Sequence, residues 1–416
     1  MTITKVVIAQ KGSREHFLAA RALHRRGMLA QMVVDWYAPL GSATRFLGHS
    51  RWRALSRAFS ARTQELPEDM ITALNFVGFK DRIRGHIARR IGSVFEATLQ
   101  SDIQYASAVA RAPLPEHDVF FGFSYASLEA LEAEKERGKL CILDQIDPGE
   151  MEYEIIRDEQ QRWPLYVASP MEVPRAYFDR LKKEWLLADA IIVNSEWSRD
   201  CNIARGAPAE KIEVVPLAYE SNGQVDSVNR RAGHPCRILW VGRVTLQKGI
   251  QYLVEAARLL ADKPVEFLIC GDVAITSKAM AAAPENMRWL GKVTFSQKSD
   301  LYDSATAFVL PTVSDGFAIT QLEAFAHGLP VIVTPNCGKV VADGVTGFVV
   351  PPRDPVALAG AISRFIDDPD LPAKMSPRCL EAVQAFSIDT YGHRLAEIID
   401  KHMQRRQRVS QTALIS

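Results

Sequence analysis

The sequence has no long apolar run and no feature of an export signal. None of its apolar stretches approaches the roughly 18 residues that a membrane-spanning helix needs. Residues 1–10 read as a strand and not as a cleavable apolar leader. These absences predict a cytoplasmic protein. With 47% hydrophobic and 24% charged residues, the chain is also no disordered protein, collagen or small disulfide scaffold.

Cysteines are few and scattered. The 416 residues include six, and none lies within four residues of another. Zinc and redox sites need closer pairs. We therefore predict buried, reduced thiols and no metal site. The six are Cys141, Cys201, Cys236, Cys270, Cys337 and Cys379.

Charge is nearly balanced overall but uneven along the chain. The formal net charge is +1, yet residues 1–115 hold 17 Lys/Arg and 8 Asp/Glu, a net of +9, so the remainder carries −8. A basic first quarter suggests an anionic partner: a membrane surface, a phosphorylated acceptor or nucleic acid. Two basic amphipathic segments, Arg51–Arg62 and Arg82–Phe95, either lie on an anionic membrane surface or pack on a sheet. The absence of a stacking-aromatic groove or a known module disfavours nucleic acid.

Short apolar runs alternate with helical patterns, which predicts βαβ units and parallel sheets. The polar stretch Tyr219–Pro235 interrupts the series and reads as a linker. We predict an α/β protein with two Rossmann-like domains facing across a cleft, where ligands bind at the carboxyl ends of strands. The expected divisions are residues 1–220, a linker at 221–235, a second domain at 236–385, and a C-terminal helix and tail at 386–416 that crosses back to the first domain.

The predicted strands of the first half are Lys5–Ala9, Leu29–Asp35, Asp118–Phe123, Leu140–Gln145, Asp189–Asn194 and Lys211–Pro216. Those of the second half are Cys236–Val241, Val265–Cys270, Asn286–Leu290, Ala307–Leu310, Val331–Thr334 and Gly347–Val350. Helices are predicted at Arg14–Arg26, Ser127–Arg137, Gly249–Ala261, Ser299–Ser304, Gly316–His327 and Pro355–Ile366.

The segment 242–249, GRVTLQKG, follows a predicted strand and precedes a helix. Arg243 and Lys248 supply two positive charges, and the helix that begins near Gly249 adds free N–H groups and the positive end of its dipole. A diphosphate fits such a site. The alternative is a solvated basic loop.

The segment 314–324, SDGFAITQLEA, carries two acids. Asp315 is placed to cap a helix starting at Gly316. Glu323 lies eight residues later among apolar neighbours, where a carboxylate needs a partner. Two acceptors here suit a hydroxyl-rich ligand with a nearby phosphate. The alternative is a capped helix with one exposed glutamate. His327 and Gly328 are expected to end the helix.

Together these motifs resemble the donor domain of retaining glycosyltransferases of family four, which have the GT-B fold and include bacterial polysaccharide and glycolipid enzymes. The matching segments are GRVTLQKG at 242–249, SDGFAITQLEAFAHGLPVI at 314–332, VADGVTGFVVPPRDPVALAGAI at 341–362 and NSEWSRDCNIARGAPAEKIEVVPLAYE at 194–220. The resemblance covers about residues 189–365 strongly and the rest weakly.

The resemblance implies a role for each matching residue. Arg243 and Lys248 would contact the donor diphosphate, and Asp315 would lie beside the transferred sugar. The backbone of Gly316, Phe317, Ala318 and Ile319 would hold sugar hydroxyls and phosphate. Glu323 would accept hydrogen bonds from ribose, Val293 would lie against the base, and Gly12 would face the donor phosphates.

The sequence departs from the family pattern at two places. The family usually has Glu where Asp315 stands, and the shorter side chain suggests a different donor sugar. It also often has a His near the reacting centre, where Gln145 is the best match and cannot act as acid or base. Asp144 or Asp147 would position the acceptor instead. A plain strand-end turn at 147–149 explains these residues equally well.

The favoured function is therefore a glycosyltransferase that uses a nucleotide-diphosphate sugar and a glycan or lipid-linked acceptor. The resemblance implies retention of anomeric configuration without an obligatory metal or other cofactor. Residues 368–370, the one Asp-x-Asp match, fall in a predicted loop. The alternatives are a sugar-nucleotide epimerase or hydrolase on the same fold and a non-catalytic binding protein. A peripheral location on the inner face of the membrane would accompany a lipid-linked acceptor.

Overall fold

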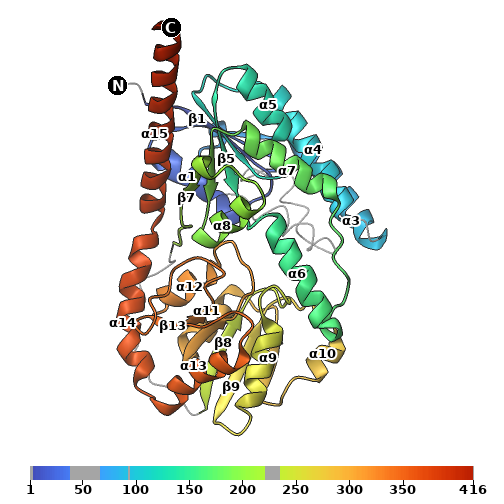
Figure 1. Ribbon diagram of the computed structural model, residues 1–416, viewed down its shortest axis with the longest axis vertical. Coiled ribbons are helices and arrows are strands. Elements are labelled where there is room, and N and C mark those ends of the chain that lie inside the picture. The colour runs from blue at the N-terminus through green and yellow to red at the C-terminus, as the bar shows by residue number, and fades with distance from the viewer. Residues whose placement is uncertain (1–2, 38–65, 92–93, 221–234, 416) are drawn as a thin grey trace.

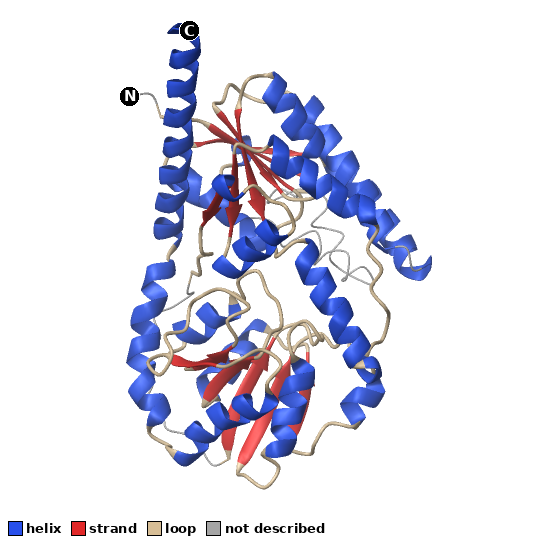
Figure 2. Cartoon of the chain, viewed as in Figure 1, coloured by secondary structure: helices blue, strands red, loops and turns tan. Residues whose placement is uncertain are grey.

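The computed structural model describes residues 3–37, 66–91, 94–220 and 235–415. It has two α/β domains, each built on one parallel sheet, stacked end to end along the long axis of the molecule (Figures 1 and 2). The prediction of two Rossmann-like parallel-sheet domains is confirmed.

The first sheet has seven parallel strands in the order β3-β2-β1-β4-β5-β6-β7. Its central strands are apolar along their whole length because helices cover both faces. Helices α1 (Leu18–Arg25) and α15 (Ile388–Ile415) cover one face, and α4 (Val94–Arg111), α5 (Leu128–Glu136) and α7 (Arg175–Leu187) cover the other. The strands are β1 (Val6–Gln10), β2 (Leu29–Val34), β3 (Ile71–Ala73), β4 (Val119–Phe123), β5 (Leu140–Gln145), β6 (Ala190–Val193) and β7 (Ile212–Val214).

The first helix begins later than the sequence predicts. Residues Glu15, His16 and Phe17 all have left-handed backbone angles, with φ of 45°, 52° and 61°, so Arg14–Phe17 is a separate turn, η1. Such angles are unfavourable for non-glycine residues, which is why a periodicity argument extends the helix through them. The helices that follow are α1 (Leu18–Arg25), α3 (Asn75–Ile91), α4 (Val94–Arg111), α5 (Leu128–Glu136), α6 (Glu150–Arg162), α7 (Arg175–Leu187) and α8 (Glu196–Ala204), with short turns η3 (Glu68–Met70), η4 (Pro164–Tyr166) and η5 (Ala209–Lys211).

The second sheet has six parallel strands in the order β10-β9-β8-β11-β12-β13. Its strands are β8 (Cys236–Val241), β9 (Val265–Cys270), β10 (Met287–Gly291), β11 (Ala307–Leu310), β12 (Val331–Val333) and β13 (Gly347–Val349). Three of the six match the predicted bounds and the others differ by one residue. The surrounding helices are α9 (Ile250–Leu259), α10 (Ser277–Ala281), α11 (Phe295–Ser304), α12 (Thr320–Ala326), α13 (Pro355–Asp367) and α14 (Leu371–Val383), followed by the turn η6 (Gln384–Phe386).

Two helical connections link the domains outside the predicted linker, one through α14 and α15 and the other through α6. Helix α14 packs on α12 of the second domain, and α15 (Ile388–Ile415) then packs on α1 of the first. On the opposite side in Figure 1, α6 runs from the first domain down to the second. Tyr166, just beyond α6, belongs to the apolar core of the second domain.

Several sequence predictions fall partly or wholly outside the described residues. The basic segment Arg51–Arg62 and most of the linker lie outside the described residues. The predicted helix over Arg82–Phe95 falls on the end of α3 and the start of α4. All six cysteines are buried and free, as predicted.

Candidate functional site

The loop after β8 brings Lys248 to the mouth of the cleft between the domains. Gly249 has a φ of 75° and precedes the first residue of α9. A Cβ there would lie 1.8 Å from the carbonyl oxygen of Pro311, so only glycine fits. This close approach brings Lys248 beside the loop that follows β11, where its Nζ forms an ion pair with Asp315.

The segment after β11 is an ordered loop and not the helix start that the sequence predicts. Helix α12 begins at Thr320, and its N-cap is Ile319. Asp315 caps the loop instead, because its Oδ1 accepts the backbone N–H groups of Phe317 (3.3 Å) and Ala318 (3.1 Å). Ala318 has a positive φ of 63°. The loop, and not a helical turn, therefore presents Gly316 to Ile319 to the cleft. The predicted end of the helix is confirmed, with His327 as C-cap and Gly328 at a φ of 62°.

First-domain side chains hold this loop from the other side of the cleft. The Ser195 and Ser198 hydroxyls donate to the carbonyl oxygen of Gly316, at 2.5 and 3.3 Å. The Trp197 indole N–H donates to the Ser314 hydroxyl at 3.2 Å. A Cβ on Gly316 would lie 2.8 Å from the side-chain nitrogen of Asn194. The two domains are thus in direct contact at the acidic motif.

A cavity of about 340 Å³ lies where these loops meet. Its second-domain wall comes from the loops after β8 and β11, and its first-domain wall comes from the loops after β1 and β5. It therefore occupies the carboxyl ends of strands in both sheets, as expected for this fold. The lining includes Arg14, Glu15, Ile146, Asp147, Glu152, Gly242, Gln247, Lys248, Asp315, Gly316, Phe317, Ala318 and Ile319.

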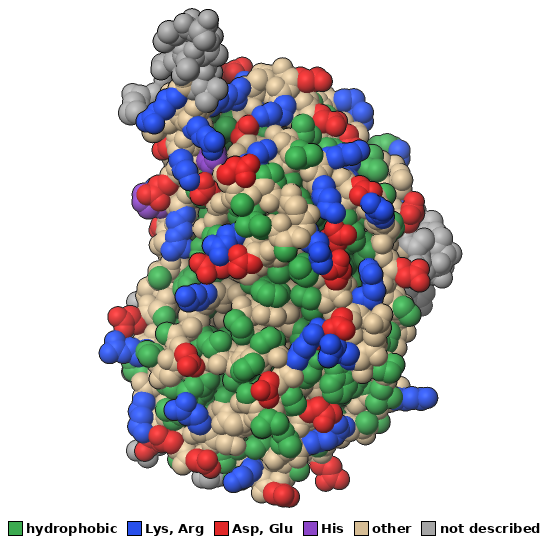
Figure 3. Space-filling view, viewed as in Figure 1, with side chains coloured by type: hydrophobic (Ala, Val, Ile, Leu, Met, Phe, Trp, Pro, Cys, Tyr) green, Lys and Arg blue, Asp and Glu red, His purple; other side chains and the backbone are tan. Residues whose placement is uncertain are grey.

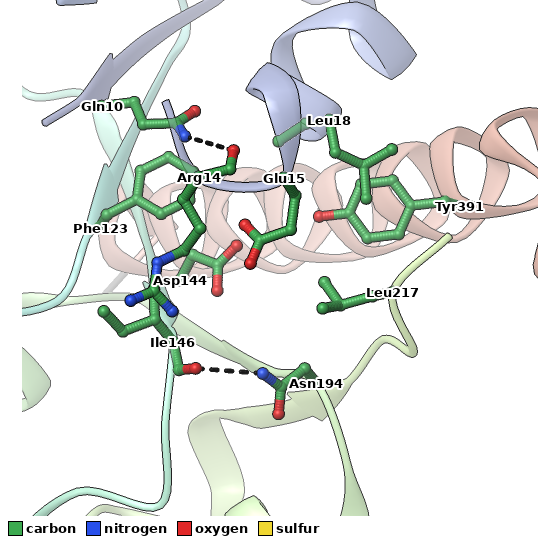
Figure 4. Close-up of a pocket in the computed structure, with 11 residues that line it drawn as sticks. Gln10, Arg14, Glu15, Leu18, Phe123, Asp144, Ile146, Asn194, Leu217 and Tyr391 are labelled. Atoms are coloured by element: carbon green, nitrogen blue, oxygen red, sulfur yellow. Dashed lines mark hydrogen bonds between the residues drawn. The ribbon is translucent and has the colours of Figure 1, made fainter. Parts of the chain in front are cut away.

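Two carboxyl groups share a recess at the first-domain end of this cavity. Figure 4 shows Glu15 and Asp144 pointing toward one another, with the guanidinium of Arg14 nearby. The recess measures about 10 Å³, the space of about one water molecule. Burial raises the pKa of Asp144 to about 8, and Glu15 adds to the shift while Arg14 opposes it. Burial likewise raises the pKa of Glu15 to about 6, again against Arg14. The pair is therefore arranged to hold a proton near neutral pH.

Gln145 and Asp147 form a buried network. Gln145 is fully buried; its oxygen accepts the Trp185 indole N–H at 2.9 Å, and its amide donates to Asp147 Oδ1 at 2.9 Å. The same Asp147 oxygen accepts the Tyr125 hydroxyl at 2.9 Å and the backbone N–H of Gly149 at 3.0 Å. Burial raises the pKa of Asp147, and the nearby Arg14 is the largest opposing influence. Gln145 therefore orients Asp147, which lines the cavity where Gln145 does not.

The remaining predicted residues lie around this centre. The backbone N–H of Gly12 donates to Asp35 Oδ1 at 2.9 Å, in a turn with a φ of 80°. Glu323, 17% exposed, accepts Lys298 Nζ at 2.9 Å and the Tyr302 hydroxyl at 2.8 Å. Val293 follows β10 and packs against the second-domain core. Neither Gly12, Glu323 nor Val293 lines the central cavity.

Arg243 points into a different cavity from Lys248. This second space, of about 300 Å³, lies between α6 and the loop after β8 and is lined also by Glu152, Tyr153, Tyr166 and Gln247. The cavities share Glu152 and Gln247, whose side chains are hydrogen-bonded. Lys248 and Arg243 thus lie on opposite sides of one loop.

No sequence pattern singles out Glu15 or Glu152. Glu15 falls within the predicted helix Arg14–Arg26, and Glu152 belongs to a strongly acidic helix in which no acid stands out. Within the described parts of the chain, no three His, Cys, Asp or Glu side chains form a group that would hold a metal ion. No described helix is both long and apolar enough to cross a membrane.

Comparisons with known proteins connect this geometry to one family. Residues 235–368 match the family "Glycosyl transferases group 1". The D-inositol 3-phosphate glycosyltransferase of Streptomyces scabiei is 31% identical over 41% of this chain and 43% of its own length. The alpha-D-kanosaminyltransferase of Streptomyces kanamyceticus is 29% identical over 51% of this chain and 60% of its own. The chain thus spans about half the length of these relatives.

Solved structures extend the likeness to the whole fold. The Anabaena protein HepE, in complex with UDP and glucose, matches 96% of this chain and 100% of its own with a TM-score of 0.59 and 15% identity. At that identity the match speaks for the fold alone. Residues 235–368 therefore form a domain of the glycosyl transferases group 1 family, within a chain that has the two-domain GT-B fold of glycosyltransferases.

Proposed function

We propose that the protein transfers a sugar from a nucleotide-diphosphate sugar to an acceptor, with retention of anomeric configuration. The observation that carries this proposal is the cavity between the domains. Its second-domain wall combines Lys248, Asp315 and the backbone of Gly316–Ile319, while its first-domain wall presents Arg14 and several carboxyl groups. A site that combines a lysine, backbone N–H groups and carboxylate acceptors suits a sugar linked to a diphosphate.

In this proposal the second domain holds the donor. Lys248 contacts the diphosphate, and Arg243 joins it from the adjacent cavity by rotation of its exposed side chain. Asp315 lies beside the sugar, and Gly316 to Ile319 hold hydroxyl and phosphate groups through their backbone. Glu323 accepts the ribose hydroxyls, with Lys298 and Tyr302 orienting its carboxylate. Val293 lies against the base, and the turn at Gly12 faces the phosphates.

The chemistry follows from charge and exclusion of water. When the bond to the sugar breaks, negative charge grows on the departing diphosphate, and preorganised cations stabilise it. Because Lys248 supplies such a charge, we propose that transfer needs no obligatory metal. Closure of both domains around the cavity keeps water from the activated sugar. Turnover unaffected by EDTA is the expected result, and loss of turnover restored by a divalent ion would contradict it.

A panel of nucleotide sugars tests the proposal. We expect one donor to raise the thermal midpoint, and the same donor to be consumed only slowly without an acceptor. An isomerised sugar in that reaction would instead indicate an epimerase, and rapid release of free sugar would indicate a hydrolase. Nucleotide binding by calorimetry without any turnover would indicate a binding protein.

We further propose that the acceptor is a glycan or lipid-linked molecule, reached from an anionic membrane surface. Residues 1–115 carry a net charge of +9. Within them, helix α3 exposes Phe76 (71%) and Phe79 (52%), with Lys80 Nζ 4.3 Å from the Phe76 ring centroid. Exposed aromatics beside cations suit a membrane interface. On the face shown in Figure 3, basic and acidic side chains are interspersed. Helix α3 is therefore a better candidate for membrane contact than that face as a whole.

Vesicle flotation tests the membrane proposal. Binding to vesicles with anionic lipid should be salt-sensitive, because each Lys or Arg near the surface contributes about 1 kcal/mol. The change of Phe76 and Phe79 to Ser should reduce flotation, whereas the same change at exposed Leu259 of the second domain (57%) should not. No flotation at low salt, together with turnover on a soluble acceptor, would rule the proposal out.

A further inference from the structure

A single carboxyl group of the first half of the chain connects the two loops that carry Lys248 and Asp315. Glu152 lies in the first turn of α6 and is 8% exposed. Its Oε1 accepts the Gln247 side-chain amide at 2.7 Å and the Ser314 hydroxyl at 3.3 Å. Gln247 directly precedes Lys248, and Ser314 directly precedes Asp315. One side chain thus touches the neighbour of each member of the ion pair.

The helix that carries Glu152 is anchored on the second domain. Two turns further along, Glu159 is fully buried and accepts the Gln251 amide and the Tyr252 hydroxyl, both at 2.8 Å. Arg353 pairs with Glu159 and with Asp158, both at 2.6 Å. These contacts fix α6 on α9 and on the segment before α13. Glu152 is therefore held at a set position relative to the loops after β8 and β11.

We infer that Glu152 is a positioning residue for the donor site, which holds Gln247 and Ser314 so that Lys248 and Asp315 keep their orientation toward the cavity. The inference rests on the proposed function. Glu152 also lines both cavities at their common wall. A shift of either loop by about 1 Å would misplace a charge aimed at the diphosphate, and a misplacement of that size can reduce a rate about 100-fold.

The electrostatic surroundings of Glu152 support a role beyond packing. Burial raises its pKa to about 8; Asp147 and Asp315 raise it further, and Lys248 opposes them. The charge of Glu152 in turn contributes to the raised pKa values of Tyr153 on the same helix and of Cys201 on α8. The group is therefore neutral in the folded protein below about pH 8. Its ionisation would add a negative charge close to Asp315, where an anionic donor must bind.

The test compares Glu152→Gln, Glu152→Ala and a matched control, Glu154→Gln. Glu154 lies on the same helix but forms a partly exposed ion pair with Arg205. We expect Glu152→Ala to lower kcat for the best donor of the panel about 10- to 100-fold. The affinity for the free nucleoside diphosphate should change less than kcat. Glu152→Gln keeps an acceptor oxygen and should retain most activity, with a weaker decline of rate between pH 7 and 9 than the wild type. The control should behave as the wild type.

Each outcome decides one point. If Glu152→Ala is as active as the control, or if Glu152→Gln keeps the wild-type pH profile, the inference is wrong. If Glu152→Ala does not fold, by circular dichroism, the pH profile of the Gln variant decides alone. If the wild type neither binds nor turns over any nucleotide sugar, the proposed function fails and this inference fails with it. A donor that is turned over equally by all variants overturns the inference only.

Discussion

Replacement of Lys248 by alanine tests the cation that the structure brings closest to the acidic loop. Lys248 is 23% exposed and its partner Asp315 is 14% exposed. The substitution removes the lysine charge from the second-domain wall of the cavity and leaves the Asp315 carboxylate without its ion-pair partner where an anionic donor must bind. We therefore expect a large loss of turnover, some loss of donor affinity and little change in the fold.

The expected magnitudes separate a functional from a structural role. Removal of one donor aimed at developing negative charge costs roughly 100- to 1000-fold in rate, or about 2.7–4 kcal/mol. A partly exposed ion pair contributes only about 0–1 kcal/mol to the free energy of unfolding. For a domain of this size about 1 kcal/mol corresponds to a shift in Tm of roughly 2–4 °C. The change in activity should thus exceed the change in stability by a wide margin.

The assay measures release of nucleoside diphosphate from the best donor, in parallel with thermal unfolding. Lys374→Ala is the matched control, because Lys374 also pairs with an aspartate of the second domain, Asp368 at 2.7 Å, but lies outside both cavities. We expect the control to keep wild-type turnover. Turnover of Lys248→Ala within about threefold of the control would refute the diphosphate role, since loss of a charge that stabilises the transition state should lower the rate roughly 100- to 1000-fold.

Three further outcomes are expected. Glu323→Gln should weaken nucleoside diphosphate binding by about 1–3 kcal/mol in calorimetry, and a 2′,3′-dideoxy nucleotide, which has no ribose hydroxyls, should show no such loss; equal losses would make Glu323 structural. Asp144→Asn should flatten the pH dependence of stability. Burial raises the pKa of Asp144 from 3.8 to about 8, so the unfolded chain loses this proton first and wild-type stability falls by up to about 1.4 kcal/mol per pH unit as the pH rises between these values. The test is the free energy of unfolding from denaturant titrations at pH 5 and 8, and the same difference between the two pH values in variant and wild type would contradict the assignment. Gly249→Ala and Gly344→Ala share the strain of a left-handed φ (75° and 72°), but only at Gly249 would the new Cβ meet the Pro311 carbonyl, so its Tm should fall further; equal shifts would disprove the clash.

The architecture was predictable because its signals are local. Buried parallel strands are continuous apolar runs bounded by polar turns, and Cys236–Val241 and Val265–Cys270 show this pattern clearly enough to give their bounds. The two ends of α12 show where local sequence signals predict the bounds of an element and where they do not. Gly328 ends the helix as its type suggests. Asp315, by contrast, has the composition of an N-cap but caps a loop that only tertiary contacts from Ser195 and Ser198 maintain.

The parts of the site that the sequence did not reveal depend on contacts between distant segments. Glu15 reaches the cleft only because three residues adopt left-handed angles, which no periodicity predicts. Glu152 matters because α6 leaves the first sheet and lies on the second domain, 95 residues before Gln247 in sequence. The ion pair between Lys248 and Asp315 likewise joins two motifs 67 residues apart.

The crossing of α15 back to the first domain limits how the protein can be divided. Ile388, Tyr391, Leu395 and Ile399 belong to the same apolar cluster as Val6 and Ile8 of β1. A fragment cut at the interdomain linker would therefore leave one face of the first sheet covered by α1 alone, while the other fragment would carry α15 with its apolar face exposed. The same cut would separate Tyr166 from the second-domain core in which it is buried. Any hybrid that combines the halves of two such proteins must match the end of α6 around Glu159 to the second domain and keep α15 with the first.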